Sequence, residues 1–182
     1  LADLPPVFSQ KALMEHVSFL TSPKLEGRGP GSPGGAAAAQ YIADRFKAIG
    51  LQPGGDAGTY LQKFTLEKGP QGTPVETVNV IGVMPGTKAA WKDQSAVLSA
   101  HYDHLGRGGQ GTSLAGAAEQ GQIHHGADDN ASGVAAALAA AELIKAKPRA
   151  RHVAFAFWSG EEIGLVGSSA YVAKPPVAND QL

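Results

Sequence analysis

Two short apolar runs, Ser95–Ala100 and Val153–Trp158, stand out in this 182-residue chain because each lies between polar loops. Runs of this length and setting are typical of buried central strands. Between them, apolar residues recur on one face of a helix over Ala131–Lys145. A strand, a helix and a second strand in this order predict a parallel β-α-β unit, which limits the chain to the α/β folds.

The preceding part of the chain carries helical and strand patterns in turn. Apolar residues recur at helical spacing over Ser9–Ser22 and again over Ala36–Ile49, where Gly50 is placed to form a left-handed cap. Alternating β-branched and aromatic residues over Thr59–Pro85 then predict two strands, with Gly69–Pro74 as the turn of a hairpin.

Composition excludes several classes of partner. A formal net charge of -1 provides no positive surplus for binding nucleic acid or an anionic membrane. No apolar run approaches the roughly 18 residues of a membrane span, so we expect no membrane insertion. With 43% hydrophobic residues, and with Gly and Pro making up about 20% of the chain, residues 1–182 are expected to form one domain with long loops.

Polar side chains gather where the predicted central strands end and where the intervening helix begins. Ligands of parallel sheets bind outside the carboxyl ends of the strands, so these residues are expected to meet at one edge. They are His101, Asp103, His104, His124, His125, Asp128, Asp129, Asn130, Glu161 and Glu162.

A metal ion is the simplest explanation for this cluster. Carboxylates gathered at one place repel each other unless a cation lies among them. The chain has no cysteine, so the ligands would be nitrogen and oxygen atoms, which suit Zn and also Mn or Co. Glu161 and Glu162 are adjacent and would point in different directions, so one could bind metal while the other reaches water.

These segments resemble the successive motifs of metallopeptidase family 28, the two-zinc aminopeptidases. The resemblance lies in His101–His104, Gly126–Gly133 and Trp158–Ser168, in this order. Leu25–Ser32 and Tyr41–Leu51 are similar to the amino-terminal segment of the same family, so the resemblance covers nearly the whole chain.

The resemblance implies a role for five residues. His101 would be a terminal ligand of one zinc ion, Glu162 a terminal ligand of the other, and Asp129 the carboxylate that bridges both. Glu161 would be the general base, and Asp103 would orient the His101 ring through its far nitrogen. Two zinc ions about 3.5 to 4 Å apart in such a site share a water and stabilise the oxyanion.

The chain departs from the family pattern after Glu162. Each zinc ion should receive one more ligand, an Asp after the next strand and a His further on. Asp180 is the only later Asp and lies in a Pro- and Ala-rich segment, and no His follows His152. We therefore expect residues 1–182 to be the amino-terminal portion of a longer catalytic domain, with little activity in isolation.

The fold implied is α/β, with a mixed, mainly parallel central sheet and helices on both faces, as in zinc exopeptidases. The expected function is hydrolysis of amino-terminal peptide bonds in peptide substrates by a secreted or periplasmic enzyme. One alternative is an acyltransferase like the single-zinc glutaminyl cyclases, which the His at position 101 disfavours. Another is a non-catalytic binding domain, which the intact Glu161 disfavours.

Other polar residues have simpler interpretations. Asp128 is interpreted as a helix N-cap, which is also the alternative for Asp129. A solvated turn is the alternative for Glu161 and Glu162. We interpret Arg28 as a structural anchor in a glycine-rich loop, and His104, His124 and His125 as loop or surface residues because they match no ligand position of the family.

Overall fold

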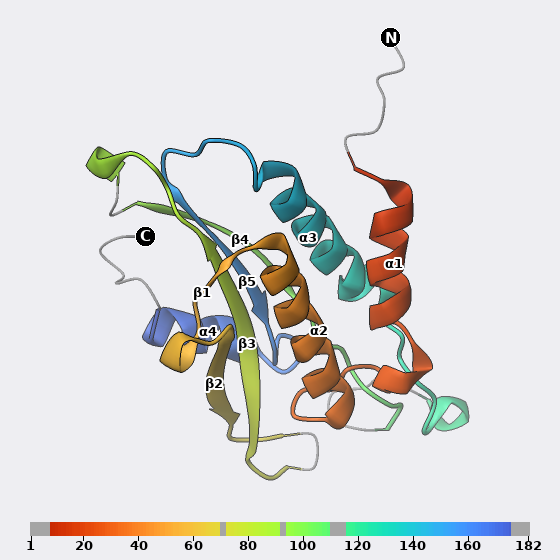
Figure 1. Cartoon of the computed structure of the whole chain (residues 1–182). Coiled ribbons are helices and arrows are strands. Elements are labelled where there is room, and N and C mark those ends of the chain that lie inside the picture. The colour runs from red at the N-terminus through yellow and green to blue at the C-terminus, as the bar shows by residue number, and fades with distance from the viewer. Residues whose placement is uncertain (1–7, 70–71, 92–93, 110–115, 176–182) are drawn as a thin grey trace.

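A computed structural model of the chain describes residues 8–69, 72–91, 94–109 and 116–175. A mixed sheet forms its centre, and helices pack on both of its faces (Figure 1). The longer helices are α1 (Gln10–Leu20), α2 (Pro33–Ile49), α3 (Gly133–Ile144) and α4 (Val166–Ala173). The strands are β1 (Gln52–Pro53), β2 (Leu61–Leu66), β3 (Val75–Met84), β4 (Ser95–His101) and β5 (His152–Trp158). Short helical turns are η1 (Pro23–Leu25), η2 (Asp56–Gly58), η3 (Ala89–Trp91), η4 (Ala117–Glu119) and η5 (Ala127–Ser132).

Local capping residues set the ends of the first two helices. The Ser9 hydroxyl accepts from the third residue of α1. The Ser32 hydroxyl caps α2, which begins at Pro33, three residues before the predicted start. Proline at the first helical position has no amide hydrogen to leave unpaired, so Ser32 and Pro33 extend the helix into the predicted loop. Gly50 ends α2 with φ of 91°, in the left-handed region, as predicted. No helix of the described segments has the length and apolar character needed to cross a bilayer.

The sheet has the order β1-β3-β5-β4, with β2 also pairing with β3. Strands β4 and β5 are parallel, from Ser95 opposite His152 to His101 opposite Trp158, which confirms the predicted β-α-β unit. β2 and β3 form the predicted antiparallel hairpin.

The sheet is only partly parallel, whereas we expected a mainly parallel one. β3 runs antiparallel to β5, with Val80 opposite Phe157 and Met84 opposite Val153. The 10-residue β3 enters the sheet from its hairpin and occupies the position beside β5, so every pairing it makes is antiparallel.

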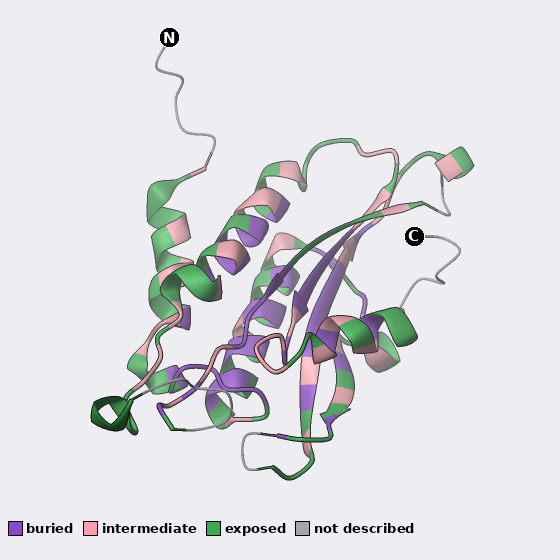
Figure 2. Ribbon diagram, turned by 180° about the vertical axis from the view of Figure 1, so that it is seen from behind, coloured by how far each residue is buried: buried purple, intermediate pink, exposed green. Residues whose placement is uncertain are grey.

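Apolar side chains cover both faces of β5. On one face Phe155 and Phe157 pack against Phe46 of α2, whose ring stacks on Phe157 with centroids 5.4 Å apart. On the other face Ala156 packs with Tyr171 of α4. The buried residues form a continuous band through the sheet and the inner sides of the helices (Figure 2). The prediction of a buried central strand is thus confirmed for β5, but it is wrong for Ser95–Ala100, because β4 is the last strand in the order of the described sheet and its Val97 and Leu98 are each 40% exposed. Because β4 and β5 are parallel, their carboxyl ends reach the same edge.

Candidate metal centre

His101 is the last residue of β4, and its two ring nitrogens face different partners. Nδ1 lies 3.2 Å from the main-chain oxygen of Asp103, which can only accept, so Nδ1 donates. Nε2 lies 2.8 Å from Oδ1 of Asp129 and 3.8 Å from Oε2 of Glu161. Nε2, the ring nitrogen that can bind a metal ion, therefore faces two carboxylates.

The carboxylates around His101 stabilise positive charge at its ring. Burial by itself lowers the pKa of His101. The nearby carboxylate of Asp103 and the charges of Glu161 and Asp129 outweigh burial and raise the pKa of His101 to about 9. A position that attracts a cation so strongly, with imidazole nitrogen and carboxylate oxygen as donors, suits a zinc ion.

Asp129 lies in η5, the turn that leads into α3, and its peptide bond to Asn130 is cis. The Asp129 side chain is 62% exposed and turns toward His101. The capping contact at the start of α3 comes from Asn130, whose Oδ1 accepts from the amide of Gly133 at 3.0 Å. Asp128, interpreted above as the cap, is exposed, and its main-chain oxygen accepts from the Ser132 hydroxyl.

Glu161 and Glu162 follow β5 in a tight turn, and their side chains reach different partners. Ligand atoms of Glu162, His101 and Asp129 all lie within 4.8 Å of one another. Glu161, with its side chain 33% exposed, instead faces Nε2 of His101. The chain therefore brings together the three residues predicted as metal ligands, and places the predicted base beside them.

Asp103 is fully buried and fixes the turn that carries Glu161. One carboxylate oxygen accepts from the amides of Gly160 at 2.9 Å and Glu161 at 3.2 Å. The other oxygen lies 3.6 Å from Nδ1 of His101, beyond hydrogen-bond length. Asp103 thus contacts the His101 ring as expected, but the hydrogen bond is to the main-chain oxygen of Asp103 and not to its carboxylate.

His104 is a site residue that the sequence interpretation placed in a loop or on the surface. Its side chain is only 12% exposed, and Nδ1 lies 2.7 Å from Oε1 of Glu162. An ionised carboxylate only accepts, so His104 donates to Glu162. Its ring also packs edge-on against that of His124, with centroids 6.3 Å apart. The one sequence feature that pointed to His104 is its place in the same motif as His101.

The arrangement of these motifs agrees with a comparison of the sequence with known families. The model of Peptidase family M28 matches residues 79–182, more than half of the chain. The chain belongs to peptidase family M28.

One relative of this M28 chain matches nearly all of it and is itself much longer. Leupeptin-inactivating enzyme 1 of Streptomyces exfoliatus is 30% identical over an alignment 180 residues long, which covers 95% of this chain and 33% of that protein. The chain therefore spans about a third of the length of this curated relative.

Two solved structures share the fold. A Zn-dependent exopeptidase from Parabacteroides distasonis has a TM-score of 0.72 at 22% identity, over 93% of this chain and 57% of that one. A glutaminyl cyclase from Porphyromonas gingivalis has a TM-score of 0.71 at 21% identity, over 96% of this chain and 58% of that one. The expected α/β fold with a central sheet flanked by helices is confirmed by this likeness.

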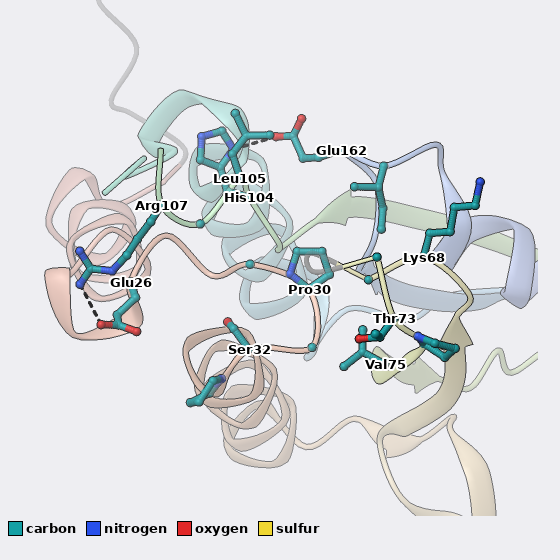
Figure 3. A pocket seen from close by; sticks show the side chains of 18 residues that line it. Glu26, Pro30, Ser32, Lys68, Thr73, Val75, His104, Leu105, Arg107 and Glu162 are labelled. Carbon is teal, nitrogen blue, oxygen red and sulfur yellow. Dashed lines mark hydrogen bonds and ion pairs between the residues drawn. The ribbon is translucent and has the colours of Figure 1, made fainter. Parts of the chain in front are cut away.

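A cavity of about 800 Å³ adjoins the candidate centre of this M28 chain. Glu162 and His104 lie on one side of it, with Pro30 and Val75 across the opening (Figure 3). An exposed ion pair lies at its rim, where Arg107 contacts Glu26 at 2.8 Å. Of the three predicted metal ligands, Glu162 lines this cavity, whereas His101 and Asp129 do not.

Proposed function

We propose that this protein is a zinc-dependent aminopeptidase that hydrolyses amino-terminal bonds of peptides. The observation that carries the proposal is the meeting of His101, Asp129 and Glu162 within 4.8 Å. Membership of peptidase family M28 adds the reaction class. The three side chains offer imidazole nitrogen and carboxylate oxygen, both of which are ligand types of zinc.

Each ligand has a distinct part in this proposal. His101 and Glu162 would each hold one zinc ion, and Asp129 would be a ligand of both; Mn or Co could substitute. When bound, zinc supplies Lewis acidity that polarises the scissile carbonyl and makes a nearby water more acidic. Two zinc ions need more than three protein ligands, so further ligands would come from outside the described residues.

Glu161 is the general base in the proposed reaction. Its carboxylate removes a proton from the attacking water, whose oxygen bonds to the carbonyl carbon. The carbon–nitrogen bond then breaks, and Glu161 returns the proton to the leaving amine. Its main-chain amide is held by Asp103, while its partly exposed side chain faces His101 and is open to water.

A second candidate is cyclisation of an amino-terminal glutamine. It is favoured by the similar TM-scores of the exopeptidase and the glutaminyl cyclase structures, 0.72 and 0.71. The two reactions differ in the nucleophile, since hydrolysis takes oxygen from water and cyclisation uses the substrate's own amine. A peptide with amino-terminal glutamine separates them, because hydrolysis releases free glutamine and cyclisation releases ammonia.

The test of the proposal is Glu161→Gln in the full-length protein. We expect kcat on an aminoacyl p-nitroanilide to fall about 10²- to 10⁴-fold, with zinc content unchanged. Glu142→Gln is the control, because Glu142 is an exposed residue of α3 that pairs only with Lys145 among the ion pairs of the described chain. Unchanged turnover in Glu161→Gln would overturn the proposed mechanism, and turnover absent from the wild type would overturn the proposed function.

The remaining proposals concern substrates and location. We infer peptide substrates from the family, and a secreted or periplasmic location from the resemblance noted in the sequence. Fractionation of the source cells with an antibody against the protein tests the location. Recovery with cytoplasmic markers alone would contradict it.

A further inference from the structure

Arg28 is fully buried, and its guanidinium donates to main-chain oxygens from three parts of the chain. Nε donates to Tyr102 at 2.8 Å. Nη1 donates to Leu20 at 2.5 Å and to His125 at 2.8 Å, and Nη2 donates to Gly126 at 3.0 Å. These contacts agree with the interpretation of Arg28 as an anchor, and they show what it anchors.

Two of the anchored segments deliver the predicted metal ligands. Tyr102 lies directly after His101, and Gly126 lies three residues before Asp129. The loop after β4 and the turn before α3 are distant in sequence, and the Arg28 side chain bonds to both. The 2.8 Å approach of His101 to Asp129 occurs where these two segments meet.

The main chain of the Arg28 loop is held independently of its side chain. The oxygen of Arg28 accepts from the amide of His104, and that of Gly27 accepts from Gly106. A β-carbon on Gly27 would lie 2.2 Å from the oxygen of Gly106, so the two loops are in close main-chain contact. A substitution of the Arg28 side chain leaves the main-chain groups that make these contacts in place.

The positive charge of Arg28 also lies near the acidic cluster. Burial lowers the pKa of Arg28 to about 10, and the charges of Asp103, Asp129 and Glu162 act in the opposite direction. Arg28 makes no ion pair with a carboxylate in the described part of the chain. Its direct partners are carbonyl dipoles, and the carboxylates of the centre act on it at longer range.

We propose that Arg28 is a positioning residue of the metal centre, setting the separation of His101 from Asp129 and thereby the affinity for zinc. This inference rests on the proposed function for its zinc readout. The planar fork of the guanidinium reaches four oxygens at once. A lysine ammonium has one nitrogen on a flexible stem and cannot bridge the same set.

The experiment compares Arg28→Lys with Arg149→Lys in the full-length protein. Arg149 is a matched control because it also donates to main-chain oxygens, those of Ile144, Lys145 and Pro85, at the far end of α3. Zinc dissociation constants come from competition with a chelator, and stability from urea unfolding of the metal-free proteins. We expect Arg28→Lys to weaken zinc binding at least about tenfold and Arg149→Lys less than about twofold, at similar losses of stability.

A second measurement does not depend on zinc. In the metal-free protein, amide hydrogen exchange should accelerate in Arg28→Lys over residues 101–106 and 124–131, with exchange in β5 unchanged. If Arg28→Lys does not fold, Arg28→Gln, which keeps one amide donor group, is measured in its place. Equal effects of the Arg28 and Arg149 substitutions on zinc affinity, or exchange that rises uniformly, would overturn the positioning role. A wild type without zinc affinity would overturn the proposed function, while the exchange result would still decide the role of Arg28.

Discussion

The buried carboxylate of Asp103 accepts a hydrogen bond from the main-chain amide of Glu161 at 3.2 Å, joining the loop after β4 to the turn after β5. Its neighbour Gly160 donates to the same oxygen at 2.9 Å. The residue two positions after His101, a proposed ligand, thus fixes the backbone of the proposed base. His101 and Glu161 are aligned through the ends of two parallel strands rather than by direct contact alone.

Asp103→Asn tests this arrangement. The substitution replaces one of the two carboxylate oxygens by an NH₂ group. Both oxygens face amide donors of the turn, since one accepts from Gly160 and the other lies 3.4 Å from the Glu161 amide. We expect kcat to fall about 10- to 100-fold and the free energy of unfolding to fall by about 1 to 3 kcal/mol, the usual cost of an unsatisfied buried group. Asp44→Asn, an exposed carboxylate on α2, is the control for both measurements. Wild-type kcat in Asp103→Asn would show that the turn holds Glu161 without this carboxylate.

His104→Ala tests the contact with Glu162. Loss of the 2.7 Å hydrogen bond leaves the Glu162 carboxylate free to rotate away from the cluster. Partners of metal ligands commonly contribute about 10- to 100-fold to affinity, so we expect the zinc dissociation constant to rise by that factor. The measurement is competition with a chelator, and His152→Ala at the start of β5 is the control. Equal zinc affinity of His104→Ala and His152→Ala would contradict a role of His104 at the metal centre.

Local patterns were sufficient to predict most of the fold. Helix α1 is preceded by Ser9, whose hydroxyl caps it, and the apolar run of β5 lies in the core between helices on both faces. The direction of β3 could not be predicted in this way. Its register with β5 joins Val80 to Phe157, 77 positions apart, and no periodicity within either strand encodes that pairing.

The residues of the candidate site were likewise predicted only in part. The ends of the predicted strands and helix indicated a cluster of polar residues at one sheet edge, and the resemblance to metallopeptidase family 28 singled out His101, Asp129 and Glu162 within it as ligands. His104 belonged to the same predicted cluster but was interpreted as a loop or surface residue because it matches no ligand position of the family, and its hydrogen bond to Glu162 is seen only in the folded chain. Which residue caps α3 was also missed, since Asn130 and Asp128 are equally able to accept from free amides.

A pH effect is expected from His16, a residue of α1 whose side chain meets Tyr41 of α2. Burial, and then the charge of Arg45, lower the pKa of His16 below 6.5, against the opposing charges of Glu15 and Glu142. Its Nδ1 lies 2.7 Å from the Tyr41 hydroxyl. As pH falls, the His16 ring of the unfolded chain takes up a proton before that of the folded chain does, so the contribution of His16 to stability is full above pH 6.5 and declines as pH falls through the lowered pKa.

Urea unfolding of the metal-free protein between pH 7.5 and 5 measures this effect, with pH values chosen to span the reference pKa of about 6.5. We expect His16→Gln, which keeps a hydrogen-bonding group but does not titrate, to lose less stability than the wild type over this range. His152→Gln provides a matched loss of one imidazole elsewhere. Parallel stability curves for the wild type and His16→Gln would contradict the prediction.

The number of ligands that meet in the described residues predicts how the 182-residue chain itself binds zinc. His101, Asp129 and Glu162 are the one group of three or more candidate ligands found in residues 8–69, 72–91, 94–109 and 116–175. Structural zinc sites have four protein ligands, and catalytic sites have three for a single ion. We therefore expect at most one zinc ion per chain, bound weakly.

Calorimetric titration of the metal-free 182-residue chain with zinc measures both the stoichiometry and the affinity. His101→Ala should remove the binding, because it takes away the nitrogen donor at the centre of the cluster, whereas His152→Ala should leave it unchanged. Cobalt titration adds a visible spectrum that reports the coordination of the ion. Uptake of two zinc ions with high affinity would show that the chain supplies a complete two-metal site, and would contradict the expectation that further ligands lie outside these residues.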